Sequence, residues 1–99
     1  MTALQIIEKL RDANPTVRTR FNVNLIALFG SYAREEQRAD SDMDLIYQSF
    51  DDYSFGLNEI TGLEDYIKDL FNVPAVDLVD KDYINPVIEM EIQNELIYV

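Results

Sequence analysis

The chain has 99 residues, of which 47% are hydrophobic, and its formal net charge is −11. It contains no cysteine and no histidine, which excludes disulfides, cysteine-bound zinc, a Ser-His-Asp triad and a histidine-ligated metal. A protein this acidic repels the phosphate backbone of nucleic acids, so we expect no direct nucleic-acid binding. The chemistry that remains belongs to carboxylates, hydroxyls and arginines.

Length and composition predict a single globular domain that covers residues 1–99. No stretch approaches the ~20 apolar residues that span a membrane, so we expect no membrane association. Glu8 and Lys9 interrupt the N-terminal segment before an apolar targeting stretch can form. The absence of cysteine fits a reducing compartment, and we expect a cytoplasmic protein.

The first predicted element is a helix that Thr2 caps, with Gln5 three residues later as its capping-box partner. Apolar residues recur along it at helical spacing: Leu4, Ile7 and Leu10. Asn14 and Pro15 are expected to end this helix, because proline removes a helical hydrogen bond.

Two apolar runs follow, and each predicts a buried strand. Residues 22–30 are too continuously apolar at their centre for an exposed edge strand, and residues 42–50 have the same character. Between them, residues 31–35 favour a short helix. Residues 51–56 are expected to form a loop.

The second half of the chain alternates between helix and strand signals. A helix is expected from Asn58, with one apolar face: Ile60, Leu63, Ile67, Leu70 and Phe71. Residues 74–80 predict a third strand. Asn85 as a cap and Pro86 at the first helical position predict a last helix, and residues 96–99 favour a short edge strand.

The predicted order is helix, strand, short helix, strand, helix, strand, helix, strand. This order indicates an α/β (α+β) fold: a small, mixed β-sheet of about four strands with helices packed against it.

The pair Gly30 and Ser31 lies where the first strand meets the short helix. Glycine permits a sharp turn and a close approach by a ligand, and the N–H groups at a helix start attract anions. The hydroxyl of Ser31 adds a further donor. These features fit a phosphate site, although most Gly-Ser pairs are plain turns.

Asp42 and Asp44 lie two residues apart at the start of the second strand, so their side chains point to the same face. Two neighbouring carboxylates repel each other, and a bound cation relieves that repulsion. Magnesium is usually held by one or two carboxylates together with substrate phosphates. The alternative is that Asp42 is a helix cap or turn residue in a solvated loop.

A third carboxylate, Asp77, lies between Val76 and Leu78 in the third predicted strand. A charged residue among core residues needs a partner or a metal. If this strand pairs with that of Asp44, Asp77 completes a three-carboxylate cluster; otherwise it faces outward from an edge strand. Asp80 is a rival, but it lies at the strand end and is better explained as part of a loop.

The stretches LFGSYAR and SDMDLIY resemble the signature of the minimal nucleotidyltransferases of the DNA polymerase β superfamily. That signature is Gly-Ser, ten residues, then Asp-x-Asp, and residues 32–41 supply the ten. The resemblance covers nearly the whole chain and implies a nucleotidyltransferase-like fold. It departs from the family pattern at Glu35, where members commonly have glycine after the Ala-Arg pair.

The resemblance implies roles for seven residues and two substrates or cofactors. Three aspartates would hold Mg²⁺, as two ions, and carry catalysis: Asp42, Asp44 and Asp77. The phosphates of ATP would lie on four residues: Gly30, Ser31, Arg34 and Ser41. Ordinary surface pairing with neighbouring acids is the alternative for Arg34.

Members of this family resemble the antitoxins of HEPN/MNT toxin–antitoxin modules, whose partner is a helical HEPN-type ribonuclease. The resemblance implies transfer of AMP from ATP to a tyrosine of such a toxin, as in type VII-like antitoxins. The alternative is an antitoxin that neutralises the toxin by binding alone. A small-molecule nucleotidyltransferase is a third possibility, disfavoured because the chain leaves no residues for a second substrate domain.

Overall fold

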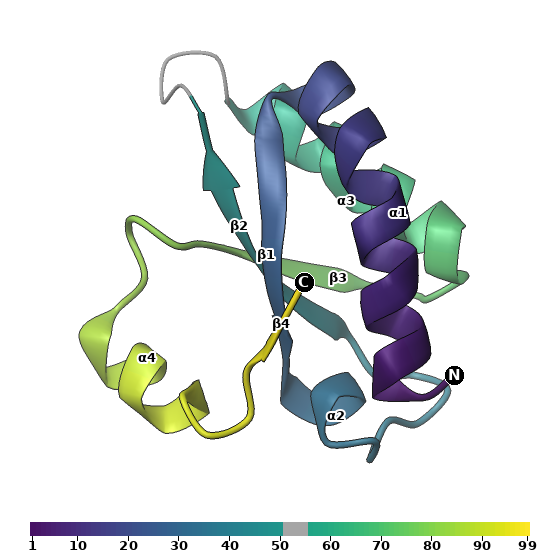
Figure 1. Ribbon diagram of the computed structural model, residues 1–99, viewed down its shortest axis with the longest axis vertical. Coiled ribbons are helices and arrows are strands. Elements are labelled where there is room, and N and C mark those ends of the chain that lie inside the picture. The colour runs from purple at the N-terminus through teal and green to yellow at the C-terminus, as the bar shows by residue number, and fades with distance from the viewer. Residues whose placement is uncertain (51–55) are drawn as a thin grey trace.

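The computed structural model describes residues 1–50 and 56–99 (Figure 1), and the order of its elements is the predicted one. Residues 51–55, which hold most of the predicted loop, lie outside the described residues. The elements are α1 (Ala3–Phe21), β1 (Val23–Phe29), α2 (Gly30–Ala33), β2 (Met43–Ser49), α3 (Leu57–Phe71), β3 (Val76–Asp80), α4 (Pro86–Ile92) and β4 (Ile97–Tyr98).

The four strands form one sheet in the order β3-β2-β1-β4. β1 pairs antiparallel with β2 and with β4, whereas β2 and β3 run parallel. The predicted mixed sheet of about four strands is therefore confirmed. The short strand at the C-terminus lies at an edge of the sheet, as its sequence favoured.

The two faces of the sheet are covered unequally, with α1 and α3 together on one face and α4 on the other (Figure 1). On the first face, which we call the closed face, apolar side chains of both helices pack against those of the strands. Leu10, Val17, Leu63 and Ile67 come from the helices, and Leu28 and Leu45 come from the strands. On the second, the open face, the set of buried apolar side chains is small: Ala27, Phe29, Ile46 and Ile92. Asp44 shares the face of Ile46, because strand residues two apart point the same way.

The first helix does not end at Asn14 and Pro15 as predicted; it continues through Pro15 to Phe21. Val17 and Phe21 extend its buried stripe, and their burial outweighs the hydrogen bond that proline removes. The side-chain amide of Asn14 bonds both backbone groups of Leu25, donating to its carbonyl at 3.1 Å and accepting from its N–H at 2.8 Å. Asn14 therefore satisfies a part of β1 that the two-residue strand β4 does not reach.

The predicted helix caps are confirmed at two helices. Thr2 and Gln5 exchange side-chain to backbone bonds in a capping box at α1. The side chain of Asn85 accepts from the N–H of Val87 at 2.8 Å, with Pro86 in the first turn of α4. Among the residues that the structure describes, no helix is both long enough and apolar enough to cross a membrane.

Candidate active site

The aspartates of β2 and β3 meet at one rung of the sheet. The parallel register pairs Asp44 with Asp77, so the two side chains stand beside each other on neighbouring strands. Asp42 precedes β2 by one residue and lies close enough to act on the charge of Asp44. Asp42 and Asp77 are exposed, whereas Asp44 is partly buried. The fold thus sets Asp77 beside Asp44, 33 positions away in the sequence, with Asp42 near enough to act on the same rung through its charge.

The charge of Asp44 is disfavoured in the folded protein. Burial raises the pKa of its carboxyl to about 6, and repulsion from Asp77 and then Asp42 adds to the effect. Glu95 raises it further, while Arg34 acts in the opposite direction. An acid placed in this way is stabilised by any cation that approaches it.

Gly30 is required by the approach of Asp44. Its φ is +76°, a left-handed conformation that favours glycine. A Cβ atom on Gly30 would overlap Oδ2 of Asp44, so the Asp44 carboxylate would have to move away from the turn. The absent side chain therefore lets the Asp44 carboxylate pack directly against the turn that leads into α2, which joins the two parts of the Gly-Ser and Asp-x-Asp signature.

The rival Asp80 is engaged elsewhere. It pairs with Tyr47 in the same parallel register, three residues beyond Asp77, and therefore on the opposite, closed face. Burial raises the pKa of Tyr47 to about 12, and the charge of Asp80 and a hydrogen bond to it add to this shift. The carboxylate of Asp80 also accepts from the N–H of Asp82 at 2.9 Å.

The donor set suits magnesium. Within the described residues, no three acidic side chains converge closely enough to form a complete metal site by themselves. Magnesium does not need one, because it takes one or two carboxylates and completes its octahedron with water and substrate phosphates. The half-buried Asp44, flanked by exposed acids, offers oxygen ligands of that kind. That all three aspartates hold metal together stays a prediction.

Arg34 is held by two carboxylates. Its Nε donates to Glu36 at 3.1 Å and its Nη1 donates to Glu95 at 2.6 Å. The hydrogen bond to Glu95, followed by that to Glu36, raises the pKa of Arg34 above its ordinary value, so the guanidinium stays charged. One of these partners, Glu36, belongs to the neighbouring acids expected from the sequence, whereas Glu95 lies 61 residues away.

Glu35, the departure from the family pattern, is bonded to the start of α1. Its φ is +57°, a conformation for which glycine is the least strained residue. The carboxylate accepts a hydrogen bond of 2.8 Å from the N–H of Ala3, the first residue of α1. A negative charge at a helix N-terminus is favourable, which offsets the strained backbone. Glu35 therefore supports α1 and keeps its charge off the Gly30 turn.

The two serines of the predicted nucleotide site differ in their surroundings. Ser31 is partly buried in the first turn of α2, directly after Gly30. The hydroxyl of Ser41 accepts from the N–H of Arg38 at 2.8 Å and so closes the turn that precedes Asp42. Contact of either serine with a nucleotide stays a prediction.

Glu95 is a site residue that sequence reasoning did not find. Its Oε1 accepts from the N–H of Gly30 at 3.2 Å, and its Oε2 accepts from Arg34. The register explains this placement: Ile97 pairs with Leu28, which carries Glu95 opposite Gly30. No local motif marks it, because its position depends on which strand β4 joins.

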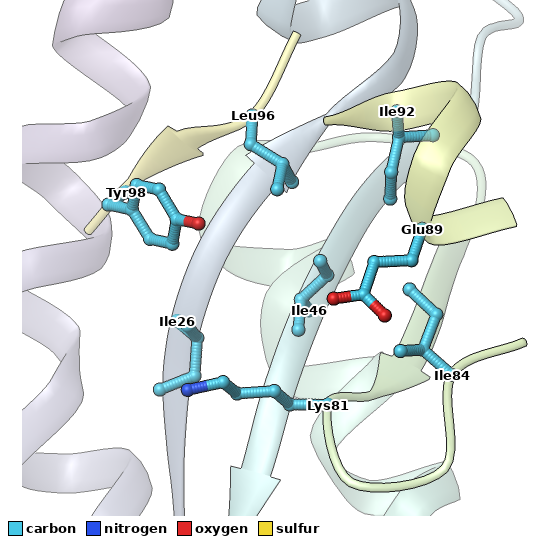
Figure 2. Close-up of a pocket in the computed structure, with 8 residues that line it drawn as sticks. All are labelled: Ile26, Ile46, Lys81, Ile84, Glu89, Ile92, Leu96 and Tyr98. Carbon is cyan, nitrogen blue, oxygen red and sulfur yellow. The ribbon is translucent and has the colours of Figure 1, made fainter. Parts of the chain in front are cut away.

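A small apolar pocket of about 50 Å³ opens on the open face between the sheet and α4 (Figure 2). Ile46 forms its floor, Ile92 comes from α4, Leu96 comes from the segment before β4, and the charged groups of Lys81 and Glu89 border it. Further apolar side chains are exposed on α4 itself: Val87, Ile88 and Met90. The face that carries Asp44 therefore also carries exposed apolar side chains on α4.

A mixed sheet that sets a Gly-Ser turn against paired strand aspartates defines a nucleotidyltransferase. The Polymerase beta nucleotidyltransferase family model matches residues 8–99, and the chain belongs to that family.

Three similar proteins support this assignment. MJ1217 of Methanocaldococcus jannaschii, provisionally named a protein adenylyltransferase, is 38% identical over 99% of this chain and 98% of its own length. A solved minimal nucleotidyltransferase has a TM-score of 0.73 at 26% identity, covering 100% of this chain and 97% of that one. A solved toxin–antitoxin complex with AMP-PNP has a TM-score of 0.67 at 26% identity, covering 99% of this chain and 72% of that one.

Proposed function

We propose that the protein is the antitoxin of a toxin–antitoxin pair and transfers AMP from ATP to a tyrosine hydroxyl of a HEPN-type ribonuclease toxin. The observation that carries this proposal is the rung formed by Asp44 and Asp77, with the Asp44 carboxylate packed against Gly30. The family model, the adenylyltransferase name of a relative and the AMP-PNP complex of a structural neighbour support it. The reaction would take place in the cytoplasm, where a ribonuclease toxin meets RNA.

In this reaction the chain positions the triphosphate and neutralises its charge. The Gly30 turn and the hydroxyl of Ser31 receive the phosphates, and the fixed cation of Arg34 lies beside them; Ser41 is a further candidate donor. Asp42 and Asp44, assisted by Asp77, would hold Mg²⁺, as one or two ions. The metal supplies Lewis-acid stabilisation of the charge that develops on the phosphate oxygens.

The acceptor tyrosine attacks the α-phosphorus of ATP. A new phenolic O–P bond forms, the bond between the α-phosphorus and the bridging oxygen breaks, and pyrophosphate leaves. Asp77 is exposed, so an acceptor from another protein can reach it. Its carboxylate accepts or directs the phenolic proton, which is general-base assistance.

The test is co-expression of this chain with the protein encoded next to it, followed by intact-mass measurement of the neighbour. The wild type should add one or more adenylyl groups to a tyrosine, and Asp42→Asn/Asp44→Asn should reduce the transfer rate on the order of 10³-fold. Circular dichroism checks that the double variant is folded. Transfer that persists in this variant contradicts the proposed roles of the aspartates.

A second candidate, an antitoxin that acts by binding alone, is favoured by the apolar side chains of α4. Val87 is 62% exposed and Met90 is 74% exposed, on a helix that also carries Glu89 and Glu91. Apolar anchors among acidic residues suit a basic protein partner. Protection of cells by Asp42→Asn/Asp44→Asn, without any mass change on the toxin, would favour this candidate over the enzyme.

A further inference from the structure

Glu95 joins two parts of the site that sequence reasoning treated separately. One carboxylate oxygen accepts from the backbone of Gly30 and the other accepts from the guanidinium of Arg34. These residues lie 65 and 61 positions away in the chain. The 2.6 Å distance to Arg34 is that of a charge-assisted hydrogen bond, which is stronger than a neutral one.

The backbone around Glu95 holds its side chain in place. Its own N–H donates to the carbonyl of Ile92 at 2.9 Å, closing the turn after α4. Two residues later the chain pairs with β1 through Ile97 and Leu28. The Glu95 side chain is only 21% exposed, so its carboxylate is fixed from both sides and partly shielded from water.

The other partner of Arg34 is different in kind. Glu36 lies two residues away on the same exposed turn, and its side chain is 67% exposed. Exposed ion pairs contribute little, because water screens them and both side chains lose rotamer freedom. The direction of the guanidinium is therefore determined mainly by Glu95.

Arg34 still has donors available for a ligand. Its side chain is 44% exposed, and within the described residues no hydrogen bond is made by its Nη2 group. The Arg34–Glu95 pair lies close to the aspartates, since both members act on the charge of Asp44. An arginine whose Nε and Nη1 are bonded to carboxylates keeps a fixed orientation, and its remaining N–H groups can donate to phosphate oxygens.

We propose that Glu95 is a positioning residue for nucleotide binding: it aims Arg34 at the triphosphate and ties the Gly30 turn to the C-terminal strand. This inference depends on the proposed function, because it needs a nucleotide at the Gly30 turn. Glu95 itself does not contact the nucleotide. Its effect is exerted through Arg34.

The substitution Glu95→Gln separates the two contacts. Glutamine retains an oxygen that accepts from the N–H of Gly30, but its amide nitrogen cannot accept from Arg34. Glu36→Gln is the matched control, since it removes a carboxylate from the same arginine without any contact to Gly30. Arg34→Gln and the double variant Arg34→Gln/Glu95→Gln complete a double-mutant cycle.

The experiment measures the affinity of each variant for AMP-PNP with Mg²⁺ by isothermal titration calorimetry. Glu95→Gln should weaken binding about tenfold and Glu36→Gln less than about twofold. The double variant should bind no more weakly than Arg34→Gln alone, because Glu95→Gln retains the contact with Gly30 and loses only the contact with that arginine. A merely structural role would instead add its loss to that of Arg34→Gln. If Glu95→Gln does not fold, Glu95→Asp takes its place in the cycle, because it withdraws the carboxylate by one methylene.

Unchanged or tighter binding by Glu95→Gln overturns the inference, since the carboxylate would then be inert or would compete with phosphate for Arg34. Additive losses in the double variant overturn it as well. In either case the wild type still binds AMP-PNP and the proposed function stands. A wild-type protein that binds no AMP-PNP in the presence of Mg²⁺ overturns the proposed function and this inference together.

Discussion

The two faces of the sheet are built from the same strands, but their carboxylates have different surroundings. On the closed face, α1 and α3 cover the strands, and the one carboxylate of the β2–β3 ladder there, Asp80, bonds to Tyr47. On the open face, Asp44 stands beside Asp77, another acid. These two polar rungs lie three residues apart: in one the carboxylate has a hydrogen-bonding partner, and in the other two carboxylates repel each other. The closed face therefore holds most of the buried apolar packing, whereas the open face carries the candidate active site.

The largest expected effect is a loss of folding stability, and its size should differ between two adjacent residues of β2. Leu45 is fully buried under α1 and α3, whereas Ile46 floors the pocket on the open face. Leu45→Ala should destabilise the protein by about 3–5 kcal/mol, since it leaves a closed cavity. Ile46→Ala should cost about 2 kcal/mol or less, because it only enlarges a space that is already open.

Urea denaturation monitored by circular dichroism measures both values. Equal losses in Leu45→Ala and Ile46→Ala would mean that the two faces contribute equally to stability, which contradicts the comparison.

Substitution of Asp44 is expected to change folding stability by a smaller amount and in the opposite direction. Asp44→Asn removes a partly buried charge that Asp77 and Asp42 repel, so the metal-free protein should become more stable at pH 7. Water reaches much of the carboxylate, which limits the gain to about 1 kcal/mol, or roughly 4–8 °C in melting temperature. Thermal melts in EDTA provide the measurement.

Asp77→Asn is the matched variant for this prediction, because it removes the other half of the same rung and should also raise the melting temperature. A lower melting temperature for both variants would show that Asp44 and Asp77 stabilise the folded protein, which contradicts the prediction.

The smallest effect concerns Tyr47 on the closed face. The pKa of Tyr47 is raised to about 12 in the folded protein. In the unfolded chain a tyrosine has a pKa of about 10 and therefore loses its phenolic proton at a lower pH. The folded state therefore binds more protons between these values, and the stability from Tyr47 is lost as pH rises from about 10 to 12. Tyr47→Phe should show a shallower loss over this range.

Alkaline denaturation of the wild type and of Tyr47→Phe measures this difference, and a spectroscopic titration of phenolate absorbance gives the pKa directly. An identical pH dependence in the two proteins would contradict the raised pKa of Tyr47 and the burial that is its main cause.

The sequence by itself determined whatever depends on near neighbours in the chain. The apolar run of residues 42–50 placed Asp44 in a strand, although Asp42 lies just before it, and capping residues marked the starts of α1 and α4. The order of helices and strands followed from runs of apolar residues, so the fold class could be predicted. Local rules failed at Pro15, where burial of Val17 and Phe21 outweighed the signal for a helix end.

Only the tertiary structure decided which of these pieces meet. The parallel register of β2 and β3 set Asp77 beside Asp44, and the pairing of β4 with β1 brought Glu95 to Gly30 and Arg34. The contact with the start of α1 gave Glu35 its partner. Strand register is fixed by long-range packing of whole faces, and no short window of sequence contains that information.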